Sequence, residues 1–305
     1  MAFTTNGVLN TVVDRYMSGL ASVSDNWSLT VDRKSADAAA LRLPAMTALG
    51  AIPTWNGTDD LSGSATSVDE YNTTGITLTA QQYGAQIAIS RLDAENVPEA
   101  VSYAAQKLGF AVANTYAQVV FGQWNNSFGS VKTGDNKALF ASDHAMASGT
   151  RSNKLTSALD SSALMAAVKL SRQFKSYDGS PYDLTAAGFY LVVPPALEEA
   201  AHQAIRSTYT LVNTGGTNTS AQGLNNVSGN FFSPADIIVS PHINFDNDWF
   251  VVSKAESPMV FWERLAPQIR LTEDEDDLKR KLTIDFAIAC DAKADPAVAI
   301  GSEVS

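Results

Sequence analysis

The side chains that could do chemistry are few in this sequence and lie far apart. Ser142-Asp143-His144 contains the residue types of a nucleophile, an acid and a base, but adjacent residues cannot orient one another as a catalytic relay requires. The sequence also has no Gly-x-Ser-x-Gly elbow to expose a nucleophile. We interpret the segment as a capped turn with a hydrogen-bonded histidine.

Two further segments contain parts of a ligand-binding motif. Residues 129–134 have the terminal glycines of a phosphate loop, but Asp135 stands where the lysine that reaches the phosphates is needed. Asn244, Asp246 and Asp248 alternate as at the start of a calcium loop, but the glycine and the bidentate glutamate that complete such a loop are absent. We expect neither ligand to bind.

The other ligand candidates do not cluster. His144, His202 and His242 have no spacing that would place two imidazoles on one helix face, and Cys290 is the only cysteine. We therefore expect no metal site, no cofactor and no catalytic residue, and we predict that the protein is not an enzyme.

The composition is that of a folded chain without a membrane segment. Of the 305 residues, 45% are hydrophobic and 17% are charged, and no window approaches the roughly 18 apolar residues of a membrane span. No secretory signal begins the sequence, so we expect the protein to stay in the cytosol. The 32 acidic and 21 basic residues give a net charge of −11, which opposes tight wrapping of nucleic acid.

Hydrophobic periodicity in the first half predicts elements that cannot form a core alone. Residues 1–63 are broken by Ser, Thr, Asn and Gly and predict an extended arm with a short helix around 8–20. Alternation over 75–91 predicts two strands in a long hairpin. The capping signals of Asn96-Val97-Pro98-Glu99 predict the start of a long helix that runs to about Trp124.

The second half predicts a compact α/β layer. A helix with Leu164 and Val168 on its apolar face precedes a buried strand at 189–193, and Pro194-Pro195 then turns the chain into a helix that ends near Arg206. Further strands are expected at 236–240, 249–253 and 282–290, with a solvated acidic turn at 273–277 and a mobile loop at 213–230.

This mixture favours assembly. The arm and the hairpin have too little hydrophobic content to form cores of their own, and such excursions usually need a neighbouring subunit to lie upon. No internal repeat suggests a solenoid. We therefore predict a structural subunit that assembles with many copies of itself into a closed shell.

Several segments carry a resemblance to one family. Residues 87–91 with Asp93 and Glu95 lead into the long helix, residues 139–144 end on an acid and a histidine, and residues 190–201 pass from strand to helix. Together they resemble the major head subunit of Mu-like tailed phages, and through it the major capsid fold of tailed phages. The ending, residues 258–264 and the strand after it, is also similar. The resemblance covers roughly 76–292 and departs from the family where Ala145, in place of proline, follows His144.

The resemblance implies an α+β capsid fold with named parts. Residues 1–50 would be the N-terminal arm and 51–83 the extended β-hairpin loop. Residues 84–185 and 253–305 would form the peripheral domain, with a spine helix at 97–124, and residues 186–252 the axial domain. It implies a fold and a role in assembly, and no catalytic site.

The resemblance also implies partners and a place in the cell. The subunit would form hexamers and pentamers of an icosahedral head and contain double-stranded DNA without gripping it. It would meet portal and scaffolding proteins, and possible decoration proteins, but no membrane. Because no scaffolding segment precedes the arm in the sequence, we expect a separate scaffold and little trimming. The head would be assembled in the cytoplasm of the bacterial host and become part of the virion.

Three alternatives stay open at this point. A cellular nanocompartment shell of the encapsulin type has the same fold and would enclose an enzyme. A soluble α/β hydrolase or transferase would use His144 with Asp143 and needs a nucleophile that the sequence does not identify. A tail-tube or adhesin-like subunit would be mostly β and would lack the long helix.

Overall fold

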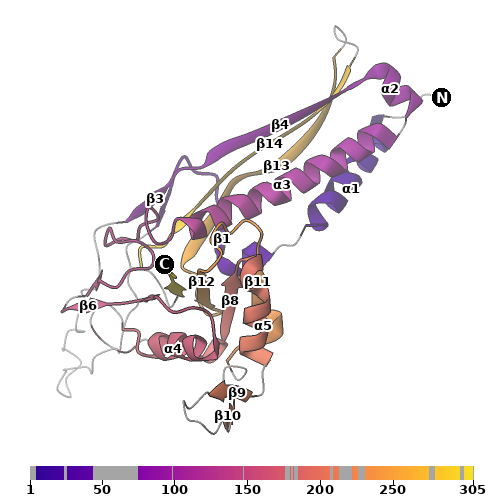
Figure 1. Cartoon of the computed structure of the whole chain (residues 1–305). Coiled ribbons are helices and arrows are strands. Elements are labelled where there is room, and N and C mark those ends of the chain that lie inside the picture. Colours follow the sequence, from indigo (N-terminus) through magenta and orange to yellow (C-terminus); the bar gives the residue numbers. More distant parts are fainter. Residues whose placement is uncertain are drawn as a thin grey trace, which may run out of the picture. The chain divides into compact units, whose positions relative to one another are not determined.

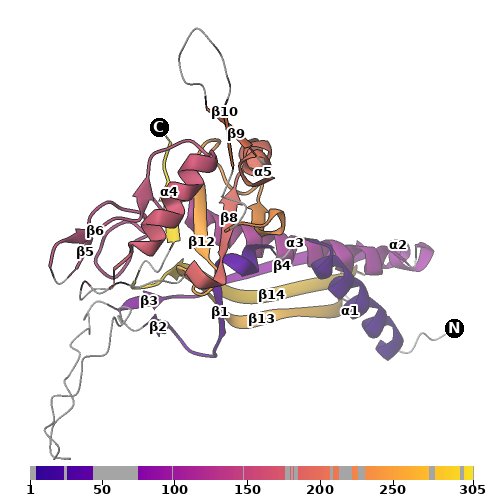
Figure 2. The same cartoon turned by 90° about the horizontal axis from the view of Figure 1, so that it is seen from below.

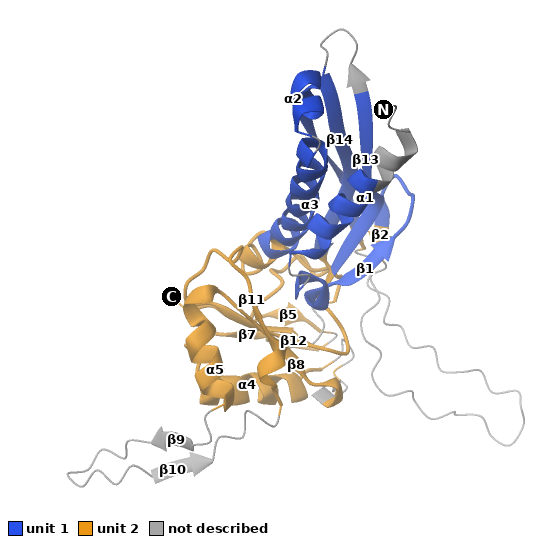
Figure 3. Ribbon diagram, turned by 90° about the vertical axis from the view of Figure 1, so that its right-hand side faces the viewer, with its two compact units in different colours: residues 1–41, 77–122, 260–291 blue, residues 42–76, 123–259, 292–305 orange. Residues whose placement is uncertain are grey.

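The computed structural model divides the chain into two compact units (Figure 3). Unit 1 comprises residues 1–41, 77–122 and 260–291, and unit 2 comprises residues 42–76, 123–259 and 292–305. The residues that the structure describes are 5–23, 26–43, 75–97, 99–146, 148–175, 179, 181, 185–206, 209–212, 222–225, 231–274, 279–295 and 299–304.

Three helices and a four-stranded sheet make up most of unit 1 (Figure 1). The helices are α1 (Thr5–Ala21), α2 (Arg91–Asn96) and α3 (Glu99–Asn125), and a 3₁₀ turn, η1, spans Asn26–Thr30. The strands, in sheet order, are β1 (Asp32–Ser35), β13 (Met259–Asp274), β14 (Lys279–Ala292) and β4 (Gln81–Ser90). Two short strands, β2 (Leu41–Leu43) and β3 (Ile76–Leu78), stand on either side of residues 44–74, which lie outside the described residues.

Aromatic side chains hold α3 against this sheet. Tyr116 of α3 lies between Phe261 of β13 and Phe286 of β14, with ring centroids 5.3 and 5.6 Å away. Trp27 of η1 packs on the same cluster, 4.8 Å from Phe261. Burial of several large rings at one place stabilises the unit, because each ring removes a large apolar area from water. The cluster therefore fixes η1, α3 and the sheet as one layer pair.

The helices α1 and α3 cross at a close approach that two glycines permit. A Cβ atom on Gly19 would lie 2.2 Å from the carbonyl oxygen of Gln106, and one on Gly109 would lie 2.3 Å from that of Tyr16. Both distances are shorter than any van der Waals contact, so larger residues could not occupy these positions without moving a helix. The amino-terminal helix is thereby packed on the long helix of its own chain.

Unit 2 is a sheet with helices on one face and aromatic rings on the other. In sheet order its strands are β11 (Ile237–Val239), β8 (Phe189–Val193), β12 (Trp249–Ser253), β15 (Ala299–Ser302) and β7 (Lys154–Leu155). The helices α4 (Ser161–Arg172) and α5 (Glu198–Arg206) pack on alternate residues of these strands. The remaining elements are short: β5 (His144–Ala145), β6 (Thr150–Arg151), η2 (Thr185–Ala187), η3 (Pro195–Leu197), β9 (Tyr209–Val212), β10 (Gln222–Asn225) and η5 (Pro234–Asp236).

The opposite face of that sheet carries the aromatic cluster. Phe250 of β12 lies 5.0 Å from Trp124, 5.4 Å from Phe140 and 5.6 Å from Phe128. Gly301 of β15 sits under the same rings, because a Cβ atom there would come within 2.6 Å of the Phe140 ring. The sheet is therefore buried on both faces, which accounts for the unbroken apolar run at 189–193.

Most of the elements predicted from the sequence are confirmed. The α+β class, the long helix (27 residues in α3), the helix near the start and the α/β layer are present as expected. The strand at 282–290 is part of β14, with Leu282, Ile284, Phe286, Ile288 and Cys290 buried.

The hairpin predicted at 75–91 is wrong. The strand β4 does not pair with β3 but runs antiparallel to β14 over ten residues, from Gln81 opposite Ile288 to Ser90 opposite Lys279. Alternation shows that a segment is extended and half-buried, but it does not identify the partner strand. Of the expected loop at 213–230, only 222–225 are described; they form β10, which pairs with β9. Of the expected extended loop at 51–83, residues 51–74 lie outside the described residues.

Candidate functional site

His144 is held as a buried structural residue. Its ring is fully buried, with Nδ1 2.9 Å from Oδ2 of Asp135 and Nε2 3.2 Å from the carbonyl oxygen of Leu139. Both ring nitrogens therefore have a partner within the chain. The hydrogen-bonded histidine expected from the sequence is confirmed, although it lies in the short strand β5.

Asp135 organises the turn around this histidine. It also accepts hydrogen bonds from the Thr133 hydroxyl at 2.6 Å, the Lys137 N–H at 3.0 Å and the Ala145 N–H at 3.2 Å. Burial alone would raise the pKa of Asp135, but the bonds from His144, Thr133 and Lys137 outweigh it and hold that pKa well below its usual range. The carboxylate is thus ionised at neutral pH and bound on several sides, as in a structural turn.

The geometry contradicts the hydrolase alternative. That reading pairs His144 with Asp143, but the Asp143 carboxylate binds the ammonium of Lys137 at the surface. Both nitrogens of the His144 ring are engaged by Asp135 and Leu139, so neither is directed at a nucleophile. The acid that binds the histidine is Asp135, nine residues before it, and not the adjacent Asp143 that the sequence suggested.

The two motif-like loops are also structural. In the loop at 129–134, the N–H of Thr133 donates to the Lys137 carbonyl and that of Gly134 to the Ala294 carbonyl, so these donors cannot cradle a phosphate. In the calcium-like stretch, the carboxylate of Asp248 accepts the N–H of Val304 at 2.8 Å. Across the described part of the chain, no group of three or more His, Cys, Asp or Glu side chains could hold a metal ion.

No helix within the described ranges has both the length and the apolar character needed to cross a bilayer.

Unit 1 exposes several large hydrophobic side chains at its surface. Among the described residues, six large hydrophobic side chains are exposed, and all six belong to this unit: Val13, Met17, Leu29, Leu92, Val97 and Tyr103. Five of them follow the helical layer through α1, α2, the residue after α2, and α3. Exposed apolar side chains along one layer are available for contact with another molecule.

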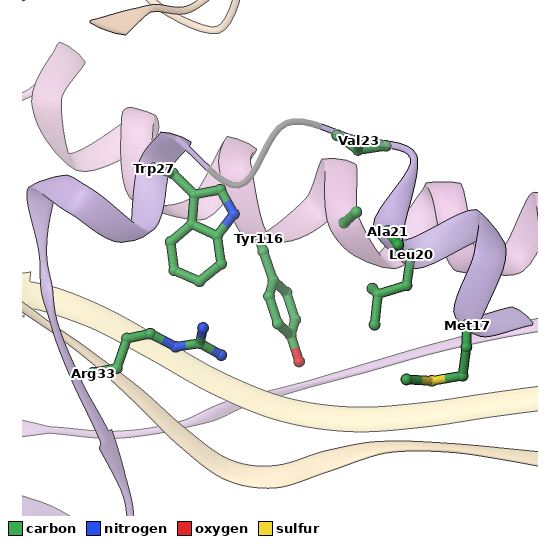
Figure 4. Close-up of a pocket in the computed structure, with 8 residues that line it drawn as sticks. Met17, Leu20, Ala21, Val23, Trp27, Arg33 and Tyr116 are labelled. Carbon is green, nitrogen blue, oxygen red and sulfur yellow. The ribbon is translucent and has the colours of Figure 1, made fainter. Parts of the chain in front are cut away.

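A pocket lies in the same unit (Figure 4). It has a volume of about 270 Å³ and is lined by apolar side chains from the end of α1, by Trp27, and by Ala113 and Tyr116 of α3. Arg33 is its only charged lining residue, with the guanidinium 5.3 Å from the Trp27 ring and 3.9 Å from the Glu263 carboxylate. The sequence analysis identified neither the pocket nor the exposed side chains, and the pocket depends on how α1, η1 and α3 pack together.

The fold and its surfaces define a structural subunit with a long helix on an elongated sheet, a second α/β unit, and apolar surface left for contacts between subunits. The tail-tube reading, which lacks a long helix, is contradicted by α3. Residues 72–300 match the family model described as phage capsid protein. The chain belongs to this family: it is a major capsid protein, a subunit of the icosahedral phage head and a part of the virion.

Solved structures show the same fold. The virus-like particle of Pyrococcus furiosus has a TM-score of 0.56 at 11% identity, covering 95% of this chain and 96% of that one. The capsid of Ralstonia phage GP4 has a TM-score of 0.55 at 11% identity, covering 92% of this chain and 88% of that one. A structure of Mycobacterium phage Che8 has a TM-score of 0.52 at 14% identity, covering 92% of this chain and 91% of that one. A search of curated protein sequences found no match.

Proposed function

We propose that this chain builds the head of a Mu-like tailed phage, as hexamers and pentamers of one subunit. The observation that carries the proposal is the capsid family match over residues 72–300, on a chain whose described fold contains the long helix and the elongated sheet. The Mu-like assignment is supported by the segments at 139–144 and 190–201. The second of these folds as β8 followed by η3 and α5.

The proposed parts of the subunit keep the roles that the resemblance implies. Residues 1–50 are the arm and 51–83 the extended loop that lies on a neighbouring subunit. Residues 84–185 and 253–305, with the spine helix, are the peripheral domain, and residues 186–252 are the axial domain. The boundaries of the two compact units differ from those of the proposed domains, because unit 2 groups residues 123–185 with 186–252 around one sheet.

The proposed contents and partners follow from charge and assembly. A net charge of −11 favours a container that holds double-stranded DNA without binding it tightly, because few phosphates are neutralised and few counterions released. Separate scaffolding and portal proteins, and decoration proteins, are the other proposed partners, with assembly in the host cytoplasm. The role is structural and involves no catalysis, cofactor or membrane.

Cryo-electron microscopy of particles made by co-expression with candidate scaffolding proteins tests this proposal. We expect icosahedral shells in which the same chain occupies both five-fold and six-fold rings. Shells that contain only five-fold rings of this chain would contradict the hexamer assignment. Purified capsomers should bind double-stranded DNA weakly, and a strong, salt-sensitive interaction at 0.15 M salt would contradict the container role.

The nanocompartment alternative shares the fold but is less well supported, because the family model matched over residues 72–300 is that of a phage capsid protein. The contents of particles isolated from their natural source discriminate the two. Packaged double-stranded DNA supports the phage head, and a single enriched enzyme without DNA supports the nanocompartment.

A further inference from the structure

We propose that α2 of one subunit docks into the pocket of unit 1 on a second copy, with the side chain of Leu92 as the anchor. This inference rests on the proposed function, which requires contacts between copies. The two surfaces are named here by their residues. The knob is Leu92, Glu95 and Val97, and the socket is the pocket lined by Met17, Leu20, Ala21, Val23, Trp27, Arg33, Ala113 and Tyr116.

The knob is apolar and unusually exposed. Leu92, in α2, is 66% exposed, and Val97, directly after α2, is 54% exposed. Ala94 of the same helix is buried. The helix itself is firmly capped, since Ser90 accepts the N–H of Asp93 at 3.0 Å. A rigid, short helix that holds a large aliphatic side chain in solvent is suited to anchor an interface, because little ordering entropy is lost on binding.

The socket has the size and lining to receive that anchor. A cavity of about 150 Å³ is enough to hold a benzene molecule, and the socket, at about 270 Å³, is larger. Figure 4 shows Leu20, Met17, Trp27 and Tyr116 arranged around it. An isobutyl group therefore fits with room for a neighbouring methyl group.

Charge favours the same pairing. Arg33 is the only charged residue of the socket, and its side chain is 51% exposed. The knob carries Glu95, three residues after Leu92 and hence on the same helix face; its side chain is 55% exposed and forms a surface ion pair with Arg91 at 3.0 Å. With Leu92 in the socket, the Glu95 carboxylate, whose exposed pair with Arg91 is worth little, would join the Glu263 carboxylate, 3.9 Å from the Arg33 guanidinium, around that cation.

The pairing must join two chains. Glu99, the first residue of α3, is two residues past Val97, and Ala113 in the socket is 14 residues further on. At 1.5 Å per residue these positions are about 21 Å apart along one straight helix. Figure 1 shows α2 beyond the amino-terminal end of α3. A knob and a socket on different faces of each copy give a head-to-tail contact, the kind that closes rings.

Two complementary variants test the pairing. Leu92→Asp removes the knob and leaves the socket, whereas Ala21→Trp fills the socket and leaves the knob. Ala21 is exposed at the end of α1, and Leu92 is exposed as well, so both variants should fold. Leu29→Asp is the matched control, because Leu29 is an exposed hydrophobic residue of the same unit that belongs to neither surface.

The experiment measures oligomeric state by native mass spectrometry, under conditions in which the wild-type chain forms capsomers. Each variant alone should lose at least tenfold in capsomer yield, while Leu29→Asp assembles normally. An equimolar mixture of the two should give 1:1 dimers that grow no further, since each dimer has one working contact and two blocked ends. Circular dichroism confirms folding, and Leu92→Ser replaces Leu92→Asp if the latter misfolds.

The inference is overturned if both variants assemble like the wild-type chain, or if the mixture stays monomeric. Failure of the wild-type chain to assemble under any condition would instead contradict the proposed function.

Discussion

Replacing Gly109 with alanine should separate α1 from α3 and destabilise unit 1. The new Cβ atom would lie 2.3 Å from the Tyr16 carbonyl oxygen and 2.8 Å from the Leu20 backbone nitrogen. Carbon and oxygen in contact are normally at least about 3.3 Å apart, so the helices must move by about 1 Å. Because the obstructing atoms are backbone, no side-chain rotation can relieve the overlap.

The size of the effect follows from two opposing contributions. Overpacking against backbone costs about 2–3 kcal/mol, because it also loosens the buried side chains of Val12 and Tyr16. Alanine in place of glycine within a helix returns about 1 kcal/mol. We therefore expect a net loss of about 1–2 kcal/mol in the free energy of unfolding.

Gly122→Ala is the matched control in the same helix. A Cβ atom on Gly122 would meet no other atom within 4 Å, so only the helix propensity changes and the variant should gain about 1 kcal/mol. Guanidinium unfolding of the unassembled subunit, followed by tryptophan fluorescence, measures both. A midpoint for Gly109→Ala that equals or exceeds that of Gly122→Ala would refute the close-packing argument.

Three further predictions concern single side chains. Asp135→Asn should lower the free energy of unfolding at pH 7 by about 3 kcal/mol, because it leaves buried His144 without its carboxylate. Since the folded pKa of Asp135 is depressed, the contribution of this carboxylate is fully present above about pH 3.9 and is lost only as the pH falls further. Urea titrations at pH 7 and at pH 2 should therefore show that the difference between variant and wild type shrinks in acid. Tyr16→Phe should raise the melting temperature by several degrees, because the buried Tyr16 hydroxyl has no hydrogen-bond partner. Burial, followed by the nearby Glu263 charge, also raises the pKa of Tyr16 to about 12. A lowered melting temperature would show that the hydroxyl forms a hydrogen bond in the folded protein. Leu108→Asp should abolish soluble expression, at a cost of about 4 kcal/mol or more, because Leu108 is 3% exposed, whereas Lys107→Asp on the exposed side of α3 should express normally.

The sequence was sufficient for elements whose own side chains determine them. The long helix was predicted from its apolar stripe, but it starts at Glu99, two residues after the expected start at 97, because Asn96, expected as its N-cap, is the last residue of α2. The strand β8 and the helix α5 are separated by two prolines that permit no other reading of the turn. Leu282, Ile284 and Phe286 alternate strictly because one face of β14 is buried.

Features that depend on distant partners could not be predicted in the same way. The pairing of β4 with β14 joins segments about 200 residues apart, and nothing in either strand specifies the other. The sequence analysis treated Asp135 only as an acid that is incompatible with a phosphate loop, whereas in the structure it is the hydrogen-bond partner of buried His144. The short helix α2 was missed, although Ser90 and Asp93 have the spacing of a cap, because strand alternation continues up to Ser90.

Size-exclusion chromatography followed by negative-stain electron microscopy of the chain, expressed alone and with candidate scaffolding proteins, tests the central claim most directly. We predict closed shells, or rings of five and six subunits and the sheets and tubes that such rings form. A monomer or dimer that persists with every scaffold would contradict the assignment of this chain as a self-assembling capsid subunit.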